Sequence, residues 1–181
     1  IHTLDYYRQG RFMELDLSAR RNLELTETLR GKEKKGSLLW VLDKTKTAMG
    51  ARMLRGWLDR PLLDVVAIQR RLKAVSLLHD NTIPREELTV ALSGIPDMER
   101  LLSRIVYGSA GGRDMVSLRK AIVQLPRLKQ QLQGLTDSKY LAELLQRLDP
   151  LEDIGREIEA TICDDPPFSV REGGFIRDGF H

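Results

Sequence analysis

The sequence predicts an all-α fold, an irregular or orthogonal bundle of about seven helices with a non-helical C-terminal tail. Apolar residues recur every three or four positions through most of the chain, which is the period of an amphipathic helix. Polar capping residues, glycines and prolines separate these stretches where helices begin and end. No convincing alternation of apolar and polar residues predicts a strand, apart from possible short extended pieces at residues 169–171 or 174–177.

The composition is that of a globular protein. The chain has 181 residues, of which 41% are hydrophobic and 30% charged, and it is long enough to bury a core. Its net charge of +3 does not by itself indicate a nucleic-acid-binding protein. The single cysteine, Cys163, excludes an internal disulfide and is typical of a reducing compartment, so we expect a cytoplasmic protein. No signal peptide or membrane span is evident, and because the chain begins without methionine we expect a fragment or processed product.

The densest apolar patterning lies in residues 36–63, which hold both tryptophans. A short apolar run at 38–42 is followed by a helix that Thr45 or Thr47 can cap and that Pro61 ends. Its stripe consists of Met49, Met53, Leu54, Trp57 and Leu58. The simplest interpretation is a core helix packed by Trp40 and Trp57.

Helices and loops are also predicted before and after residues 36–63. Asp16 or Ser18 begins a short helix or extended segment, and residues 30–36 form a charged surface loop. Asp64 caps a long helix that ends at residues 79–81, and Thr82 caps the next, with Pro84 in its first turn.

A helix begins at residues 95–97, and three more helices follow it. A glycine-rich connector at 108–112 leads to a long helix in which Pro126 predicts a kink. Asp137 or Ser138 begins another, and Pro150 stands at the first position of the last helix. After residue 162 the pattern stops.

Little in the sequence indicates catalysis. The segment Gly31–Ser37 resembles a phosphate loop but lacks the lysine after the second glycine, so it is interpreted as a solvated turn. The pair Asp164-Asp165 could bind a hard cation, but two aspartates before two prolines more often form an exposed turn. The histidines and Cys163 show no zinc spacing. We therefore predict no catalytic, cofactor-binding or metal-binding residue in this chain.

The clusters of basic side chains can be interpreted in three ways. The clusters are Arg20-Arg21, Lys32–Lys35, Arg70-Arg71 and the arginines from Arg100 to Arg119. They could contact phosphates, form solvated faces with their acidic neighbours, or act as arginine–carboxylate struts between helices. A basic stripe on one surface would favour an independent helical nucleic-acid-binding module, whereas scattered and paired arginines would favour a structural role.

Several segments match one known family. They are Asp16 with 20–25 (RRNLEL), 37–62 (SLLWVLDKTKTAMGARMLRGWLDRPL), 71–75 (RLKAV), 97–105 (DMERLLSRI), 108–114 (GSAGGRD), 164–167 (DDPP) and 173–179 (GGFIRDG). Spread over nearly the whole chain, they resemble the core of the MutS DNA mismatch-repair family. The sequence departs from that pattern at Ala19, Ala48, Ala51 and Gly111-Gly112, which affects local packing only.

The resemblance implies the fold of the MutS core, domain III, in its first part before the clamp insertion. Residues 1–14 would be a lead-in segment, 15–162 the helical core or lever domain, and 163–181 an irregular segment leading toward the absent clamp. The intact protein would be a bacterial mismatch-repair ATPase in which this lever couples mismatched-DNA binding to the ATPase domain. The fragment would be inactive alone, and no catalytic residue can be carried over.

The same resemblance implies the partners of the intact protein. These are ATP and Mg²⁺, mismatched duplex DNA, the clamp, connector and ATPase domains, a second copy in a homodimer, and the repair protein MutL, with no membrane. Two hypotheses follow from the breaker residues and the truncation. Pro126 and the glycines at 108–112 would be hinges, and an apolar stripe left exposed would favour self-association or low stability.

Overall fold

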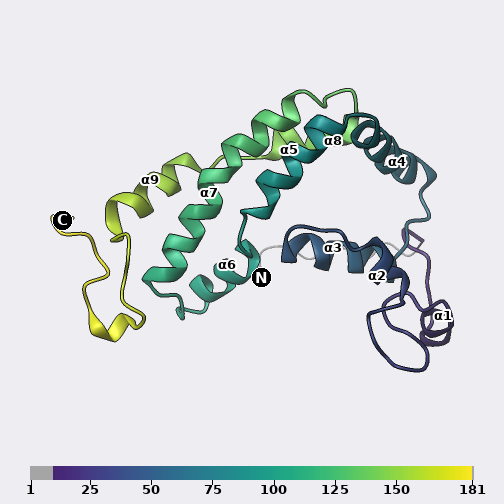
Figure 1. The fold of residues 1–181 in the computed structure, drawn as a ribbon, viewed down its shortest axis with the longest axis horizontal. Coiled ribbons are helices and arrows are strands. Elements are labelled where there is room, and N and C mark those ends of the chain that lie inside the picture. Colours follow the sequence, from purple (N-terminus) through teal and green to yellow (C-terminus); the bar gives the residue numbers. More distant parts are fainter. Residues whose placement is uncertain (1–9, 181) are drawn as a thin grey trace. The chain divides into compact units, whose positions relative to one another are not determined.

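The computed structural model describes residues 10–180 (Figure 1). The helices are α1 (Leu17–Asn22), α2 (Leu38–Leu42), α3 (Ala48–Asp59), α4 (Val65–Asp80), α5 (Thr82–Ser93), α6 (Met98–Val106), α7 (Gly112–Gln133), α8 (Lys139–Arg147) and α9 (Glu152–Thr161), with a 3-10 turn, η1, at Val170–Glu172. The described residues form no strand, only two isolated β-bridges. The predicted all-α class is confirmed, and seven of the helices, α3 to α9, have nine residues or more.

Contacts divide the chain into two compact units. The described residues up to Thr45 and Gly50–Lys73 form the first unit, and Lys46–Met49 with the residues from Ala74 onward form the second. Two of the three divisions therefore fall inside α3 and α4, and the third lies between Thr45 and Lys46, before α3. The domain limits expected from the sequence (1–14, 15–162 and 163–181) are not tested by this division and stay a prediction, and most of the lead-in lies outside the described residues.

The first unit is held together by polar contacts at the end of α3. Asp16 caps α1, because its Oδ1 accepts from the Ala19 N–H at 2.6 Å. One turn of α1 then presents Arg20, whose Nη2 donates to the backbone oxygen of Asp59 at 3.1 Å and whose Nη1 lies 3.6 Å from the Asp59 carboxylate. The short segment predicted as helical or extended is thus a capped helix tied to α3.

The two tryptophans do not form a core, so that interpretation is wrong. Trp40 is 46% exposed and Trp57 38% exposed, and α3 has no buried residue. Instead, the Arg71 guanidinium lies 3.8 Å from the centroid of the Trp57 ring. The negative face of the ring attracts the cation, and the contact lies on a partly exposed ring at the surface. The amphipathic spacing therefore predicted a helix correctly but misassigned its environment.

Most predicted helix boundaries are confirmed. The helix α3 begins directly after Thr47 and ends two residues before Pro61. Asp64 caps α4, since its Oδ1 accepts from the second and third N–H groups of that helix at 2.9 and 3.3 Å. Thr82 is not a cap but the first residue of α5. Asn81 stands at the N-cap position, and its side chain donates to a carbonyl of the preceding helix at 2.8 Å.

Later boundaries follow the same pattern. Asp97 caps α6, with its Oδ1 accepting from the Arg100 N–H at 3.2 Å. Ser138 stands directly before α8, as predicted, and is buried. Pro150 was expected at the first position of α9 but lies two residues earlier. Leu151 takes a left-handed conformation with φ of 53° at the N-cap, which delays the start of the helix.

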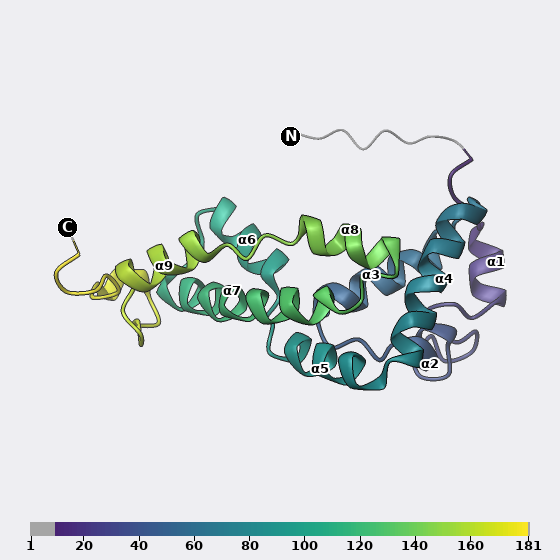
Figure 2. The same ribbon diagram turned by 90° about the horizontal axis from the view of Figure 1, so that it is seen from above.

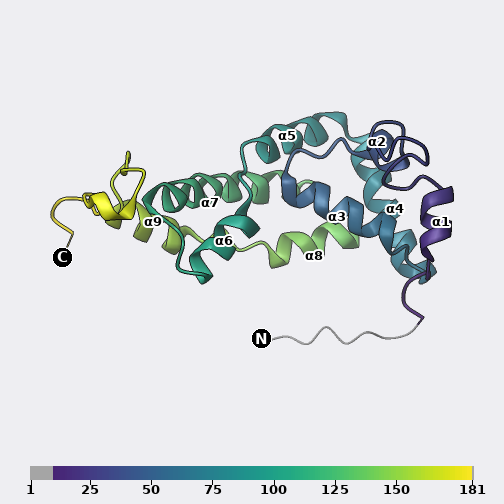
Figure 3. The same ribbon diagram turned by 90° about the horizontal axis from the view of Figure 1, so that it is seen from below.

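The second unit is built around α7, which contacts α5, α6, α8 and α9. In Figures 2 and 3, α8 and α9 follow one another along one side of α7, and α5 lies on another. Three buried apolar clusters succeed one another along this helix. They are Leu101, Val116, Leu118, Ile122, Ile158 and Ile162; then Ala91, Ile95, Ala121, Leu125 and Leu128; then Ala74, Leu135 and Leu141. One 22-residue helix thus supplies or adjoins all three.

Pro126 lies inside α7, which runs without interruption from Gly112 to Gln133. Pro126 removes one backbone hydrogen bond, and the packing on both sides of it keeps the helix continuous. The kink that we predict at Pro126 stays a prediction. Between residues 10 and 180, no helix is both long and apolar enough to cross a membrane.

The tail is irregular, as predicted, with one difference. Residues 170–172 form the 3-10 turn η1 rather than an extended piece. Ile176 does pair with Ile162 in an antiparallel bridge, so the extended piece expected at 174–177 is reduced to this one contact.

Shortening a buried α7 side chain should destabilise the fold. Ile122 is 3% exposed, and its Cγ2 would lie 3.0 Å from a Cβ added at Gly155 of α9. Ile122→Ala should lower the free energy of unfolding by about 2–4 kcal/mol, because it leaves a cavity at this contact. Urea unfolding of the chain, followed by far-UV circular dichroism, measures the change.

The matched control is Val123→Ala at the next position of α7, where the side chain is 64% exposed. That change should alter the unfolding free energy by less than about 0.5 kcal/mol. Equal losses for the two variants would show that α7 does not form the core of this unit.

Candidate functional site

Among residues 10–180, no group of three or more His, Cys, Asp or Glu side chains is placed to hold a metal ion. His79 is exposed at the end of α4, 3.0 Å from Asp80, while His2 and His181 lie outside the described residues. The thiol of Cys163 donates to the backbone oxygen of Gly174 at 3.4 Å. The expected absence of catalytic, cofactor and metal residues stays a prediction.

The loop that resembles a phosphate loop has a structural role at its end. Ser37 is buried and caps α2, because its hydroxyl accepts from the Trp40 N–H at 3.2 Å. Lys34 donates to Asp43 across the base of the loop at 2.5 Å. The hydrogen bonds from Lys34 and Thr45 lower the pKa of Asp43 from 3.8 to about 2. These contacts support the interpretation as a turn, because its hydroxyl and one of its lysines are used within the fold.

The C-terminal segment is fastened to the end of α9 by backbone contacts. The Cys163 N–H donates to the Phe175 oxygen at 3.1 Å, and the Arg177 N–H donates to the Thr161 oxygen at 2.7 Å. Arg113, in the first turn of α7, donates through Nε to the backbone oxygen of Pro166 at 3.1 Å. A segment without a periodic pattern is therefore held in place by polar contacts to two helices.

Asp164 is the polar centre of this junction. One of its carboxylate oxygens, Oδ1, lies 3.1 Å from Nη2 of Arg119 in α7 and 3.1 Å from Nη2 of Arg177 in the tail. The hydrogen bond from Arg119, then the charge and hydrogen bond of Arg177, hold the pKa of Asp164 below its ordinary 3.8. Because two guanidinium groups already occupy this carboxylate, the junction uses Asp164 as an ion-pair bridge, whereas the sequence offered a cation ligand or an exposed turn.

Gly112 allows the tail to approach α7 closely. A Cβ placed on this residue would lie 2.6 Å from the Cβ of Pro166 and 3.2 Å from the Cβ of Phe175. Any larger residue would push the tail away from the helix, since real Cβ atoms do not approach so closely. The junction thus needs a glycine at the first position of α7.

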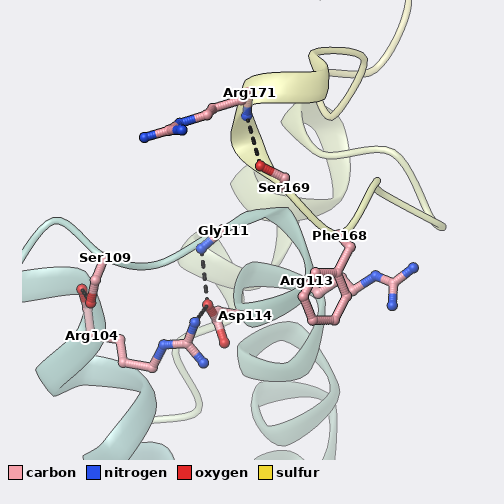
Figure 4. Close-up of a pocket in the computed structure, with 8 residues that line it drawn as sticks. All are labelled: Arg104, Ser109, Gly111, Arg113, Asp114, Phe168, Ser169 and Arg171. Carbon is pink, nitrogen blue, oxygen red and sulfur yellow. Dashed lines mark hydrogen bonds and ion pairs between the residues drawn. The ribbon is translucent and has the colours of Figure 1, made fainter.

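A cleft of about 550 Å³ opens beside this junction (Figure 4). Its lining residues are Arg104, Ser109, Gly111, Arg113, Asp114, Phe168, Ser169 and Arg171. They come from the end of α6, the glycine-rich connector, the first turn of α7 and the tail around η1. No sequence pattern indicated Phe168 or Arg171, because the tail has no period from which a shared surface could be predicted.

Several arginines across the fold are paired with carboxylates. Those with a carboxylate within 4 Å include Arg20, Arg55, Arg85, Arg104, Arg119 and Arg177. They lie on different helices and in the tail. This arrangement is the one that favours struts between elements over a continuous basic stripe.

Removing the charge of Asp164 should change how stability depends on pH. Its carboxyl has a lowered pKa in the folded chain, so the stabilisation is present above about pH 4, the ordinary value, and is lost as pH falls through the folded pKa. Asp164→Asn should therefore lower the melting temperature at pH 7 and flatten the loss of stability on acidification. Thermal melts between pH 7 and acidic pH measure both.

The neighbouring Asp165→Asn is the matched control, because Asp165 is exposed and makes no ion pair with another described residue. If both variants have the same melting temperatures at every pH, Asp164 does not hold the junction.

Comparison with known proteins agrees with this architecture. The sequence pattern of MutS domain III matches residues 18–178. The chain is 49% identical over 181 residues to the DNA mismatch repair protein MutS of Alkaliphilus oremlandii, 47% over 175 residues to that of Lachnoclostridium phytofermentans and 44% over 176 residues to that of Listeria monocytogenes. These alignments cover 97–100% of the chain, which spans about a fifth of the length of the curated relatives it matches. The chain belongs to the MutS family, as its domain III.

Proposed function

We propose that this chain is the lever of a DNA mismatch-repair protein, a rigid helical piece that couples mismatched-DNA binding to an ATPase domain elsewhere in the intact protein. The proposal rests on the length and continuous packing of α7. Its 22 residues correspond to a rod of about 33 Å, and packed clusters succeed one another along it. A packed rod moves as one body, so a displacement at one end reaches the other.

The junction supports the same role. The tail is fastened to α7 and α9 by the bridge through Asp164 and by the close contact at Gly112. A segment held in this way transmits force to or from whatever follows it in the intact protein. By the family resemblance, that would be the clamp that closes over the duplex.

Exposed apolar residues also support a role inside a longer protein. Leu102, Val106 and Tyr107 of the α6 segment are 50%, 81% and 85% exposed. Apolar side chains gathered on one short helix usually face a partner. We propose that further core helices of the intact protein cover them, and that the chain alone tends to self-associate.

The remaining parts of the proposal concern the intact protein. It would hydrolyse ATP with Mg²⁺ in its ATPase domain, act as a homodimer with clamp and connector domains, and work with MutL in the bacterial cytoplasm. The chain itself would contribute by position alone, with the nucleotide bound in the ATPase domain. The alternative, an independent nucleic-acid-binding module, is less well supported, because the arginines that lie within 4 Å of a carboxylate are spread over several helices and the tail.

The coupling can be tested by widening the junction in the intact protein that carries this chain. Gly112→Ala places a Cβ 2.6 Å from Pro166 and should displace the tail from α7. We expect mismatched DNA to stimulate ATP hydrolysis several-fold less than in the unchanged protein, with the basal rate preserved. Steady-state ATP hydrolysis with and without mismatched duplex measures this.

Gly134→Ala is the matched control. It lies just after the other end of α7 with φ of −77°, and an added Cβ would meet nothing within 4 Å. It should leave both rates unchanged. Undiminished stimulation in Gly112→Ala would refute the proposed coupling through this junction.

The isolated chain gives a second test. It should hydrolyse no ATP and should bind matched and mismatched duplexes with equal affinity, because the parts proposed to recognise mismatches and nucleotide lie elsewhere. Fluorescence anisotropy with both duplexes and a phosphate-release assay are the measurements. A preference for the mismatch would show that this chain itself reads DNA.

A further inference from the structure

The cleft beside the α7 junction carries a net positive charge. Three of its lining residues are arginines and one, Asp114, is an aspartate, which leaves a formal excess of two positive charges, 3 − 1. Asp114 is already engaged: its Oδ2 lies 3.0 Å from Nη2 of Arg104 and accepts from the Gly111 N–H at 2.9 Å. The carboxylate therefore neutralises Arg104 and leaves the charge on the other two arginines.

Both arginines line the cleft, and Figure 4 shows their guanidinium groups pointing to opposite sides of it. The Arg113 guanidinium lies 5.3 Å from the centroid of the Phe168 ring and donates one bond, to a neutral carbonyl, so its charge is not cancelled. The Arg171 side chain makes no ion pair with any residue that the structure describes. Figure 4 shows it extending from η1 above the Ser109–Gly111 connector. A guanidinium without a carboxylate beside a cleft is suited to an anionic ligand.

The rest of the lining suits an oxyanion. Ser169 contributes a hydroxyl group that accepts from the Arg171 N–H at 3.3 Å and keeps its own hydrogen for a ligand, whereas the Ser109 hydroxyl donates to the Arg104 backbone oxygen at 3.2 Å. The cleft volume of about 550 Å³ is far larger than one small anion. It can therefore admit a group that belongs to a longer chain running past the surface.

We propose that this cleft binds a backbone phosphodiester of nucleic acid, with Arg171 as the contacting cation and Arg113 as a second positive charge on the other side of the cleft. The Phe168 ring is 83% exposed and lies beside Arg113, so it adds a flat surface on that other side of the cleft. The site goes beyond the proposed lever role, which requires no contact between this chain and DNA. It carries no sequence preference, because phosphate contacts position a protein without reading bases.

The salt dependence of binding tests the proposal. The chain is titrated into a short labelled DNA duplex between about 50 and about 200 mM salt, and binding is followed by anisotropy. Arg171→Ala should weaken binding several-fold at the lowest salt. It should also reduce the slope of log K against log salt by about one, equally for matched and mismatched duplexes.

The matched control is Arg127→Ala, which removes the same charge from an exposed position on α7 outside the cleft. Far-UV circular dichroism establishes that both variants are folded. A fall in slope for Arg127→Ala equal to that for Arg171→Ala would overturn the proposal, because only net charge would then matter. So would a wild-type chain that binds no duplex at low salt, as expected if the cleft instead receives an acidic protein segment.

These outcomes are independent of the lever role. Gly112→Ala in the intact protein reports coupling through the junction, whereas Arg171→Ala in the chain reports a direct phosphate contact. Either result can fail while the other stands.

Discussion

The packing of apolar side chains along α7 is the interaction on which the second unit depends. A helix of 22 residues is longer than its neighbours, and each of α5, α6, α8 and α9 buries its apolar face against a part of it. Because the three clusters are arranged in series, no neighbouring helix has to span the whole unit. Ala121, which is fully buried, and Gly155 allow close approach where large side chains would separate the helices.

Polar contacts hold the C-terminal tail in place, because the apolar clusters do not. The tail contributes little to the core, so its position depends on backbone hydrogen bonds, on the Asp164 carboxylate between two guanidinium groups, and on the space left by Gly112. Exposed ion pairs of this kind are individually weak. Their contribution is to the position of the tail, because together with the close backbone approach at Gly112 they favour one arrangement of the tail on α7.

The same junction explains why this helical unit has a cleft. The turn between α6 and α7 and the tail each expose polar groups, and the tail lies on α7 without filling the space above the turn. Arg104 and Asp114 pair with each other at the base, while Arg171 stays open at the rim. The Arg104–Asp114 ion pair and the Arg171 side chain, unpaired among the described residues, therefore line the same cleft.

The sequence by itself determined the class of fold, most helix boundaries and the family. Periodic apolar residues and caps such as Asp16, Asp64 and Asp97 act locally, through bonds within a few residues, and so can be recognised without a structure. The environments of Trp57 and Asp164 were decided only by the tertiary structure, as was the grouping of Phe168 and Arg171 with Arg113. These depend on contacts between residues far apart in the chain, such as Arg71 with Trp57 and Arg119 with Asp164, and helical spacing reports which face a side chain occupies but not what meets it.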